Sequence, residues 1–231
     1  LFLDIKNRIE FKLDSADFDT LNLELKELNV LLSSTNNSYY KIIIKQLILF
    51  VEAIALYKNN RGKYSEALNM LIKSIRMTTS SFDLDNYNSY VYSSTELRIL
   101  MNIAFLLNKL NYYEKYIEIM EFCFQSADPS DDIYPKLCHN LSGALNRKKE
   151  YLKALHVSNM GIEACQKTRN LNGLNILYYG KAIVEFHLGN PEYIKSLHIA
   201  LTLCEALGQD KLKNDIIRIC REVLDIDLQI L

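Results

Sequence analysis

The sequence contains little glycine and proline, with seven glycines and three prolines among its 231 residues. Together they make up about 4% of the chain, against roughly 12% in average proteins. Because β-sandwiches and β-barrels need these residues at their many tight turns, the composition argues against both folds. A chain of this length with so few helix breakers is expected to be almost entirely helical.

The sequence also lacks an excess of charge of either sign, with 27 basic and 28 acidic residues. A domain that binds nucleic acid by itself carries a basic surface, so this balance argues against that function. With 49% hydrophobic and 24% charged residues, the composition is that of an ordinary globular protein, and no membrane span or membrane partner is expected.

The cysteines and histidines show no pattern that would hold a metal or a disulfide framework. The five cysteines, at positions 123, 138, 165, 204 and 220, form no C-x-x-C pair and lie in apolar helical patterns. They are expected to be reduced core residues of a cytoplasmic protein. The four histidines have no metal-ligand spacing, so no cofactor is expected. The sequence has no G-x-S-x-G, phosphate loop or Cys-His spacing, and this predicts that the protein is not an enzyme.

Four segments repeat an aromatic residue followed three residues later by a small or aromatic residue. They begin at Tyr64, Tyr113, Tyr151 and Tyr193, with a weaker fifth at Phe18. Each opens an apolar helical run and follows a short turn and another such run. The predicted helix pairs are 2–13 with 17–32, 38–59 with 63–77, 84–108 with 112–126, 133–147 with 150–168, and 172–188 with 192–207, before a last helix at about 210–225.

Helix pairs of this kind bury their apolar faces only by stacking on one another. We therefore expect an all-α, right-handed α-solenoid of about five helix pairs over residues 1–208. The last helix, within residues 209–231, is expected to cap it with the stripe of Leu212, Ile216, Ile219 and Val223. A second stripe, Ile217, Cys220 and Leu224, either meets a partner chain or belongs to one broad buried face.

The few glycines are expected to play two roles. Gly62 and Gly189 lie in turns between paired helices. Gly143, Gly161 and Gly180 lie inside predicted helices, where a residue without a side chain lets a neighbouring helix approach closely.

The segment Gly62-Lys-Tyr-Ser-Glu-Ala-Leu68 closely resembles the tetratricopeptide repeat (TPR), whose second helix opens with Y-x-x-A, and the segment 150–155 is a fair match. The standard period is 34 residues, whereas the aromatic anchors here lie 38 to 49 residues apart. Stretched TPR-like repeats with a capping helix resemble the peptide-sensing domains of the Rap, Rgg, NprR, PlcR and PrgX (RRNPP) family of quorum-sensing regulators, most of all its PlcR-like branch. The resemblance covers essentially the whole chain.

This resemblance implies a cytoplasmic sensor domain that binds a short signalling peptide in a concave groove and switches a homodimeric transcriptional regulator. The helix-turn-helix domain of that regulator, through which alone it would contact DNA, is expected to precede Leu1 and to be absent from this chain. Two alternatives remain open. One is a TPR scaffold that grips the C-terminal tail of a protein partner, and the other is a peptide-controlled inhibitor of a response regulator.

Two polar pairs are the main candidates for peptide binding. Laying the third repeat over the fourth without gaps places Arg98 over Lys136 and Asn102 over Asn140. The members of each pair lie four residues apart, on one face of a first helix, and first helices line the concave side of such a solenoid. An Asn amide can pair with both groups of a peptide unit, and an Arg or Lys with a carboxylate. The alternative is that all four are ordinary surface residues.

Further peptide-binding candidates follow from position on the first helices. A single helix over 84–108 would continue the face of Arg98 through earlier residues, and the second and fifth repeats offer comparable stretches. These candidates are Tyr87, Tyr90, Ser94, Gln46, Asn175, Tyr178 and Tyr179. For each tyrosine, packing between helices is an equally open interpretation.

Overall fold

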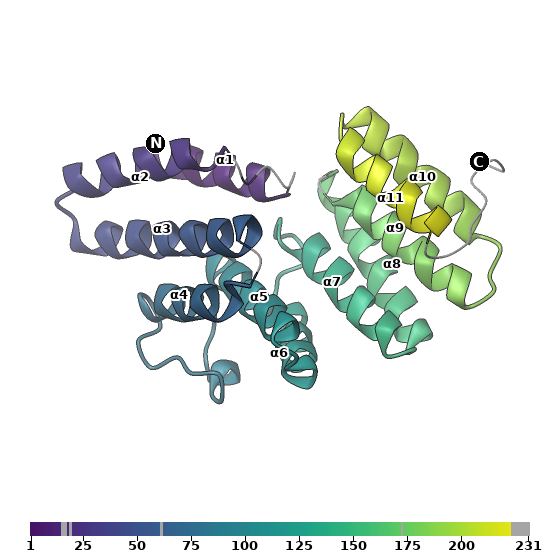
Figure 1. The fold of residues 1–231 in the computed structure, drawn as a ribbon, viewed down its shortest axis with the longest axis horizontal. Coiled ribbons are helices and arrows are strands. Elements are labelled where there is room, and N and C mark those ends of the chain that lie inside the picture. The colour runs from purple at the N-terminus through teal and green to yellow at the C-terminus, as the bar shows by residue number, and fades with distance from the viewer. Residues whose placement is uncertain (15–17, 19, 61, 172, 223–231) are drawn as a thin grey trace. The chain divides into compact units, whose positions relative to one another are not determined.

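In the computed structural model, described for residues 1–14, 18, 20–60, 62–171 and 173–222, every regular element is a helix (Figure 1). The α-helices are α1 (Phe2–Asp14), α2 (Asn22–Ser34), α3 (Ser38–Asn59), α4 (Tyr64–Arg76), α5 (Ser94–Lys109), α6 (Tyr113–Ser126), α7 (Tyr134–Arg147), α8 (Tyr151–Thr168), α9 (Leu174–His187), α10 (Tyr193–Ala206) and α11 (Asp210–Glu222). A short 3-10 helix, η1, spans Tyr87–Ser89. The predicted all-α class is confirmed.

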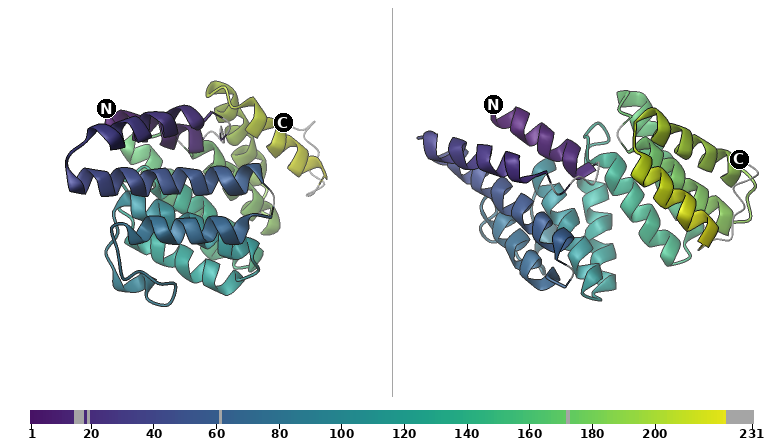
Figure 2. Two further views of the ribbon diagram at one scale, coloured as in Figure 1. Left: turned by 60° about the vertical axis from the view of Figure 1, so that its left-hand side comes forward. Right: turned by 45° about the horizontal axis from the view of Figure 1, so that its top comes forward.

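The chain divides into two compact units, Leu1–Ser126 with α1–α6 and Ala127–Leu231 with α7–α11. Within each unit every helix packs against the next helix along the chain. Neighbouring helices run antiparallel, as α2 and α3 do in Figure 2. In the second unit α7 also contacts α9 directly, so the first helices of successive pairs lie together. This is the helix-turn-helix repeat predicted from the periodicity of apolar residues.

The predicted helix over 84–108 is wrong in its first ten residues. Helix α5 begins only at Ser94, because Ser93 and Glu96 form a capping box in which the Glu96 carboxylate accepts a hydrogen bond from the Ser93 N–H at 2.8 Å. Upstream, the Asn86 side-chain amide donates to a backbone carbonyl of the same loop at 3.0 Å. Such local bonds compete with helix formation.

Among the described residues, five helices end in the same left-handed turn. The residues with positive φ at these ends are Asn111 (70°), Lys149 (63°), Arg169 (54°), Gly189 (67°) and Gly208 (64°). In each case the N–H of the following residue donates to the carbonyl five positions earlier, as Tyr112 does to Leu107 at 2.9 Å. This is the Schellman motif, which satisfies carbonyls at the helix end. The turn predicted at Gly189 is confirmed, and Gly62 also has a positive φ, of 100°.

Gly161 lets α8 pack closely against both α7 and α9. A Cβ at this position would lie 2.7 Å from the Cβ of Cys138 and 2.7 Å from a methyl carbon of Leu177. Neither contact is sterically possible without movement of the neighbouring helices. The role predicted for Gly161 is therefore confirmed.

The other two helical glycines differ from each other. A Cβ at Gly180 would lie 3.3 Å from Nδ1 of His139 on α7, so this position is also close to a neighbouring helix. At Gly143 the nearest atom would be 3.7 Å away, on Arg147 of the same helix. The prediction that Gly143 allows helices to approach is therefore wrong.

Helix α11 packs against α10. Ile216 and Cys220 are buried in one cluster with side chains of α9 and α10. Cys220 therefore shares the buried face of Ile216, as the interpretation of one broad buried face requires, while Ile217 is half-buried. Positions 223 and 224 of the predicted stripes lie outside the described residues. The capping and dimerisation roles of this helix stay predictions.

All five cysteines are buried free thiols, as predicted. Burial raises the pKa of Cys138 to about 12 and the pKa values of Cys165 and Cys220 to about 11. Because the thiolate is the nucleophilic form, these side chains are unreactive packing residues at neutral pH.

Candidate functional site

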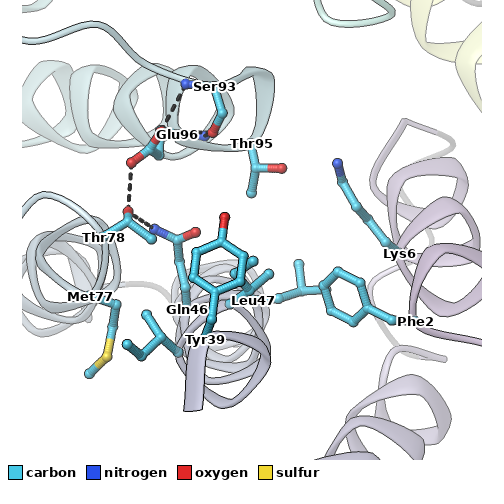
Figure 3. Close-up of a pocket in the computed structure, with 12 residues that line it drawn as sticks. Phe2, Lys6, Tyr39, Gln46, Leu47, Met77, Thr78, Ser93, Thr95 and Glu96 are labelled. Atoms are coloured by element: carbon cyan, nitrogen blue, oxygen red, sulfur yellow. Dashed lines mark hydrogen bonds between the residues drawn. The ribbon is translucent and has the colours of Figure 1, made fainter. Parts of the chain in front are cut away.

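A pocket with a volume of about 580 Å³ opens in the first unit between α1, α3 and the start of α5 (Figure 3). These three helices are the first helices of the first three repeats. Its lining residues are Phe2 and Lys6 of α1, Tyr39, Ile42, Ile43, Gln46 and Leu47 of α3, Met77 and Thr78 after α4, and Ser93, Thr95 and Glu96 at the start of α5. Several side chains from separate parts of the sequence thus converge on one space.

One side of the pocket is apolar. Leu47 is buried, Phe2 and Ile43 are half-buried, and Ile42 and Met77 are more exposed. When a ligand covers apolar side chains that are still accessible at a cavity, the burial of their surface favours binding. This side is therefore suited to an apolar group.

The polar part of the lining is a chain of hydrogen bonds. The Gln46 amide nitrogen donates to the Ser74 carbonyl at 3.2 Å and to the Thr78 hydroxyl at 2.6 Å. Thr78 donates in turn to Oε1 of Glu96 at 2.6 Å (Figure 3). Burial raises the pKa of Glu96, but the hydrogen bonds from Thr78, Ser93 and Thr79 outweigh it and leave that pKa lowered. Glu96 is thus a stable carboxylate whose hydrogen bonds hold this wall together.

Four polar groups point from this framework into the pocket in Figure 3: the amide oxygen of Gln46, the hydroxyls of Tyr39 and Thr95, and the ammonium of Lys6. Within the described part of the chain, the three oxygens have no hydrogen-bond partner. Lys6 pairs with Glu10 over a long distance of 3.8 Å. The pocket therefore presents one acceptor, the Gln46 oxygen, one charged donor, Lys6, and two hydroxyls that can donate or accept, beside an apolar surface.

Gln46 is the predicted candidate that the structure places in this pocket. The sequence interpretation missed Lys6, Tyr39 and Thr95. A signal for one of them was present, because Tyr39 precedes Gln46 by seven residues and so lies on the same face of α3. For Lys6 and Thr95 no signal existed, since their helices meet α3 only through tertiary packing.

Arg98 and Asn102 lie next to this region on α5, but both are engaged within the fold. Arg98 is buried, and its Nε lies 3.7 Å from Oε1 of Glu10 on α1. Asn102 donates to the Arg98 carbonyl at 2.7 Å and accepts from the Tyr57 hydroxyl at 3.1 Å. A peptide would have to displace these partners, and a binding role for the pair stays a prediction.

The matching pair of the fourth repeat, Lys136 and Asn140, lies on α7 in the second unit, where both side chains are half-buried. The side chain between them, His139, has a buried Nδ1 with no hydrogen-bond partner among the described residues. Burial lowers the pKa of His139 to about 4, and the charges of Lys136 and Arg147 contribute. This imidazole is therefore neutral near pH 7. A peptide-binding role for Lys136 and Asn140 stays a prediction.

Tyr87 and Tyr90 do not continue the helix face of Arg98, so this prediction is wrong. Tyr87 lies in η1, and its ring packs edge-on against Phe122 with centroids 5.4 Å apart. Tyr90 follows η1 and donates from its hydroxyl to the Ser81 carbonyl at 2.8 Å. Both lie in the loop that the capping box at the start of α5 keeps out of the helix. Ser94 does lie on α5, as its first residue.

The candidates of the fifth repeat support packing of the second unit. Asn175 is buried and donates to the side-chain oxygen of Gln209 at 2.6 Å, so it links α9 to the turn before α11. Tyr179 packs against the cluster around Cys220, and burial raises its pKa to about 12. Tyr178, next to it, is half-buried. The structure thus gives Asn175 and Tyr179 structural contacts, which leaves their predicted peptide contacts untested.

The described residues contain no group of three or more His, Cys, Asp or Glu side chains that could hold a metal ion. Across the same residues, no helix is both long and apolar enough to cross a membrane. The interactions that the described side chains offer are hydrogen bonds, ion pairs and apolar contacts.

No protein-family model matches this sequence, and no curated protein matches it. Solved structures, in contrast, share its fold. Bacillus thuringiensis PlcR in complex with the peptide PapR7 and DNA has a TM-score of 0.75 at 16% identity, over 93% of this chain and 73% of PlcR. The apo form of PlcR has a TM-score of 0.69 at 16% identity, over 93% and 76%. A Podosopora anserina protein with nearly identical TPR-like repeats has a TM-score of 0.54 at 12% identity, over 89% and 97%.

These similarities establish a TPR-like helical repeat fold, which confirms the predicted fold class. The matched structures are a protein solved with a peptide and DNA and a repeat protein, and neither is described as an enzyme.

Proposed function

We propose that this chain is the peptide-sensing domain of a transcriptional regulator of the RRNPP family, in its PlcR-like branch. The observation that carries the proposal is a pocket on the first helices of three successive repeats, in a fold shared with a protein solved with both a peptide and DNA. The regulator would act in the cytoplasm as a homodimer. It would contact DNA through a helix-turn-helix domain that precedes Leu1.

The pocket chemistry supports a short extended peptide as the ligand. Such a peptide exposes unpaired N–H and C=O groups along its backbone, as well as separate side chains. The Gln46 amide oxygen and the Tyr39 and Thr95 hydroxyls can satisfy backbone groups, while the apolar side of the pocket covers a side chain. A simple sugar would leave that apolar side unused.

The position of the pocket supports a switching role. Because α1, α3 and α5 each contribute lining residues, a bound peptide contacts three helices at once. A ligand shifts a conformational equilibrium only by its differential affinity for the two states, and a site built from several helices distinguishes arrangements of those helices. Peptide binding in the first unit would in this way alter how the preceding DNA-binding domains are held.

Two experiments test the proposal. The first mixes the purified chain with a degenerate mixture of synthetic heptapeptides, separates the complex by gel filtration and identifies retained peptides by mass spectrometry. Retention of a restricted set of peptides supports the sensor function, and no retention contradicts it. The second reads the gene upstream of the Leu1 codon. A coding sequence for a helix-turn-helix domain supports the regulator, and its absence contradicts that part of the proposal.

A further inference from the structure

We propose that the pocket of the first unit binds the last residue of the peptide, with Lys6, Tyr39 and Thr95 holding its free carboxylate and the apolar side holding its side chain. This inference rests on the proposed peptide-binding function and adds the end of the peptide that is recognised. It predicts a ligand with an unmodified C terminus and an apolar last residue.

The donors in the pocket match a carboxylate. The Lys6 ammonium and the Tyr39 and Thr95 hydroxyls come from three different helices and point into the same space (Figure 3). A carboxylate accepts several hydrogen bonds, and bonds from a charged donor are about twice as strong as neutral ones. The Lys6–Glu10 pair is long, at 3.8 Å, and Glu10 also lies 3.7 Å from Arg98, so Glu10 keeps a cation when Lys6 turns to a ligand.

The amide oxygen of Gln46 is in a fixed orientation. Because the Gln46 nitrogen donates to both the Ser74 carbonyl and Thr78, the amide cannot turn over without losing two hydrogen bonds. Its oxygen therefore stays directed into the pocket, where it can accept the N–H of the last peptide unit. A terminal residue presents this combination of one N–H beside a carboxylate.

The opposite end of a peptide fits less well. A terminal ammonium is bound most strongly by a carboxylate, and Glu96 is the acidic side chain among the described lining residues. Both of its oxygens are already used, Oε1 by Thr78 and Thr79 at 2.6 and 3.1 Å and Oε2 by the Ser93 N–H and hydroxyl at 2.8 and 2.7 Å. Lys6 would also repel a second cation.

The apolar side sets the preference for the last side chain. Phe2, Ile43, Leu47 and Met77 line the pocket from α1, α3 and the end of α4. A charged side chain placed there would lose hydration without gaining a partner. Leucine, isoleucine, methionine, valine or phenylalanine at the last position is therefore expected.

The test uses two degenerate heptapeptide mixtures, one ending in free carboxylates and the other in carboxamides, with gel filtration and mass spectrometry as the readout. Retention from the free-acid mixture is expected to exceed retention from the amide mixture by at least about tenfold. Apolar last residues are expected to be enriched among the retained peptides. Equal retention from both mixtures overturns the inference and leaves the peptide-binding function standing. No retention from either mixture overturns the proposed function itself.

Matched variants assign the effect to the pocket. Lys6→Met is expected to lower retention of the free-acid peptides by at least about tenfold, whereas Lys45→Met, at an exposed lysine on α3 outside the pocket, is not. Tyr39→Phe is expected to weaken retention several-fold, and Tyr40→Phe, next to it but outside the pocket, is not. An effect of Lys6→Met no larger than that of Lys45→Met overturns the assignment.

Discussion

The Nε atom of Arg98 lies 3.7 Å from Oε1 of Glu10, and this pair ties the first helix of the third repeat to the first helix of the first repeat. The Arg98 side chain is only 5% exposed, so its charge has lost most of its hydration and the Glu10 carboxylate compensates for that loss. Lys6, which lines the pocket, is a second cation beside the same Glu10 oxygen, at 3.8 Å. The cation predicted to take a peptide carboxylate thus already faces a carboxylate of its own chain.

Glu10→Gln should lower the free energy of unfolding by about 1–2 kcal/mol, because it removes a charged partner from a buried guanidinium. Urea unfolding followed by circular dichroism measures the change. Glu66→Gln is the control, since Glu66 pairs with Lys63 on the surface, where both side chains are exposed. The control should change stability by less than about 0.5 kcal/mol. Equal effects of the two substitutions would contradict a stabilising role for the Glu10–Arg98 pair.

Gly161→Ala should lower the free energy of unfolding by about 1–3 kcal/mol, because its Cβ would meet the Cβ of Cys138 at 2.7 Å and force helices apart. Gly143→Ala should instead raise it by about 0.5–1 kcal/mol, because alanine favours the helix and no neighbouring helix is close. Thermal unfolding of the two variants measures both effects. A Gly161→Ala variant as stable as the unsubstituted protein would contradict the close approach at Gly161, and a destabilising Gly143→Ala would contradict the open space at Gly143.

His139 should make the protein less stable in mild acid. Burial lowers its pKa to about 4 in the folded chain, against about 6.5 in an unfolded one. Between these values the unfolded chain binds a proton that the folded chain does not, so stability falls as the pH drops from about 6.5 to 4. The loss from this group should reach about 3 kcal/mol below pH 4.

Urea unfolding at several pH values measures this dependence, and His139→Gln should flatten it across that window. An NMR titration reports the same group directly. A His139 ring that titrates near pH 6.5 in the folded protein would rule out this source of acid sensitivity.

Lys149→Gly should raise the free energy of unfolding by about 0.5–1 kcal/mol, because Lys149 adopts a φ of 63° at the end of α7, where glycine has no steric penalty. Gly189→Ala tests the same turn from the other direction. Gly189 has a φ of 67° and open space around it, so alanine should cost about 1 kcal/mol from backbone strain alone. Differential scanning calorimetry measures both, and a stabilising Gly189→Ala would contradict the argument.

Much of the fold could be predicted because helix formation here depends on neighbours in the chain. The predicted range 38–59 coincides with α3, and the ends of α7 and α8 were predicted to within a residue. The difference at 84–108 has a local cause as well, since the Ser93–Glu96 capping box that starts α5 is itself a local pattern of the sequence.

Less of the candidate site could be predicted. The stripe of α3 that contains Tyr39 and Gln46 follows from helical spacing, but the roles of Lys6 and Thr95 do not. Asn175 shows the same limit, because its partner Gln209 lies on the far side of an intervening helix in the sequence. A polar residue on a predicted helix face can bond to another part of the chain or to a ligand. Its position in the sequence does not distinguish the two.

The sequence by itself determined that the chain is a series of antiparallel helix pairs, because apolar periodicity, turn residues and helix caps act over three to five residues. The tertiary structure alone decided which polar groups remain available in the pocket. The Gln46 nitrogen donates to the Ser74 carbonyl, and Arg98 faces Glu10. Lys6 and Thr95, in contrast, line the same pocket from two different helices. Those pairings depend on how α1, α3, α4 and α5 pack in three dimensions, and packing brings together side chains that no local pattern relates.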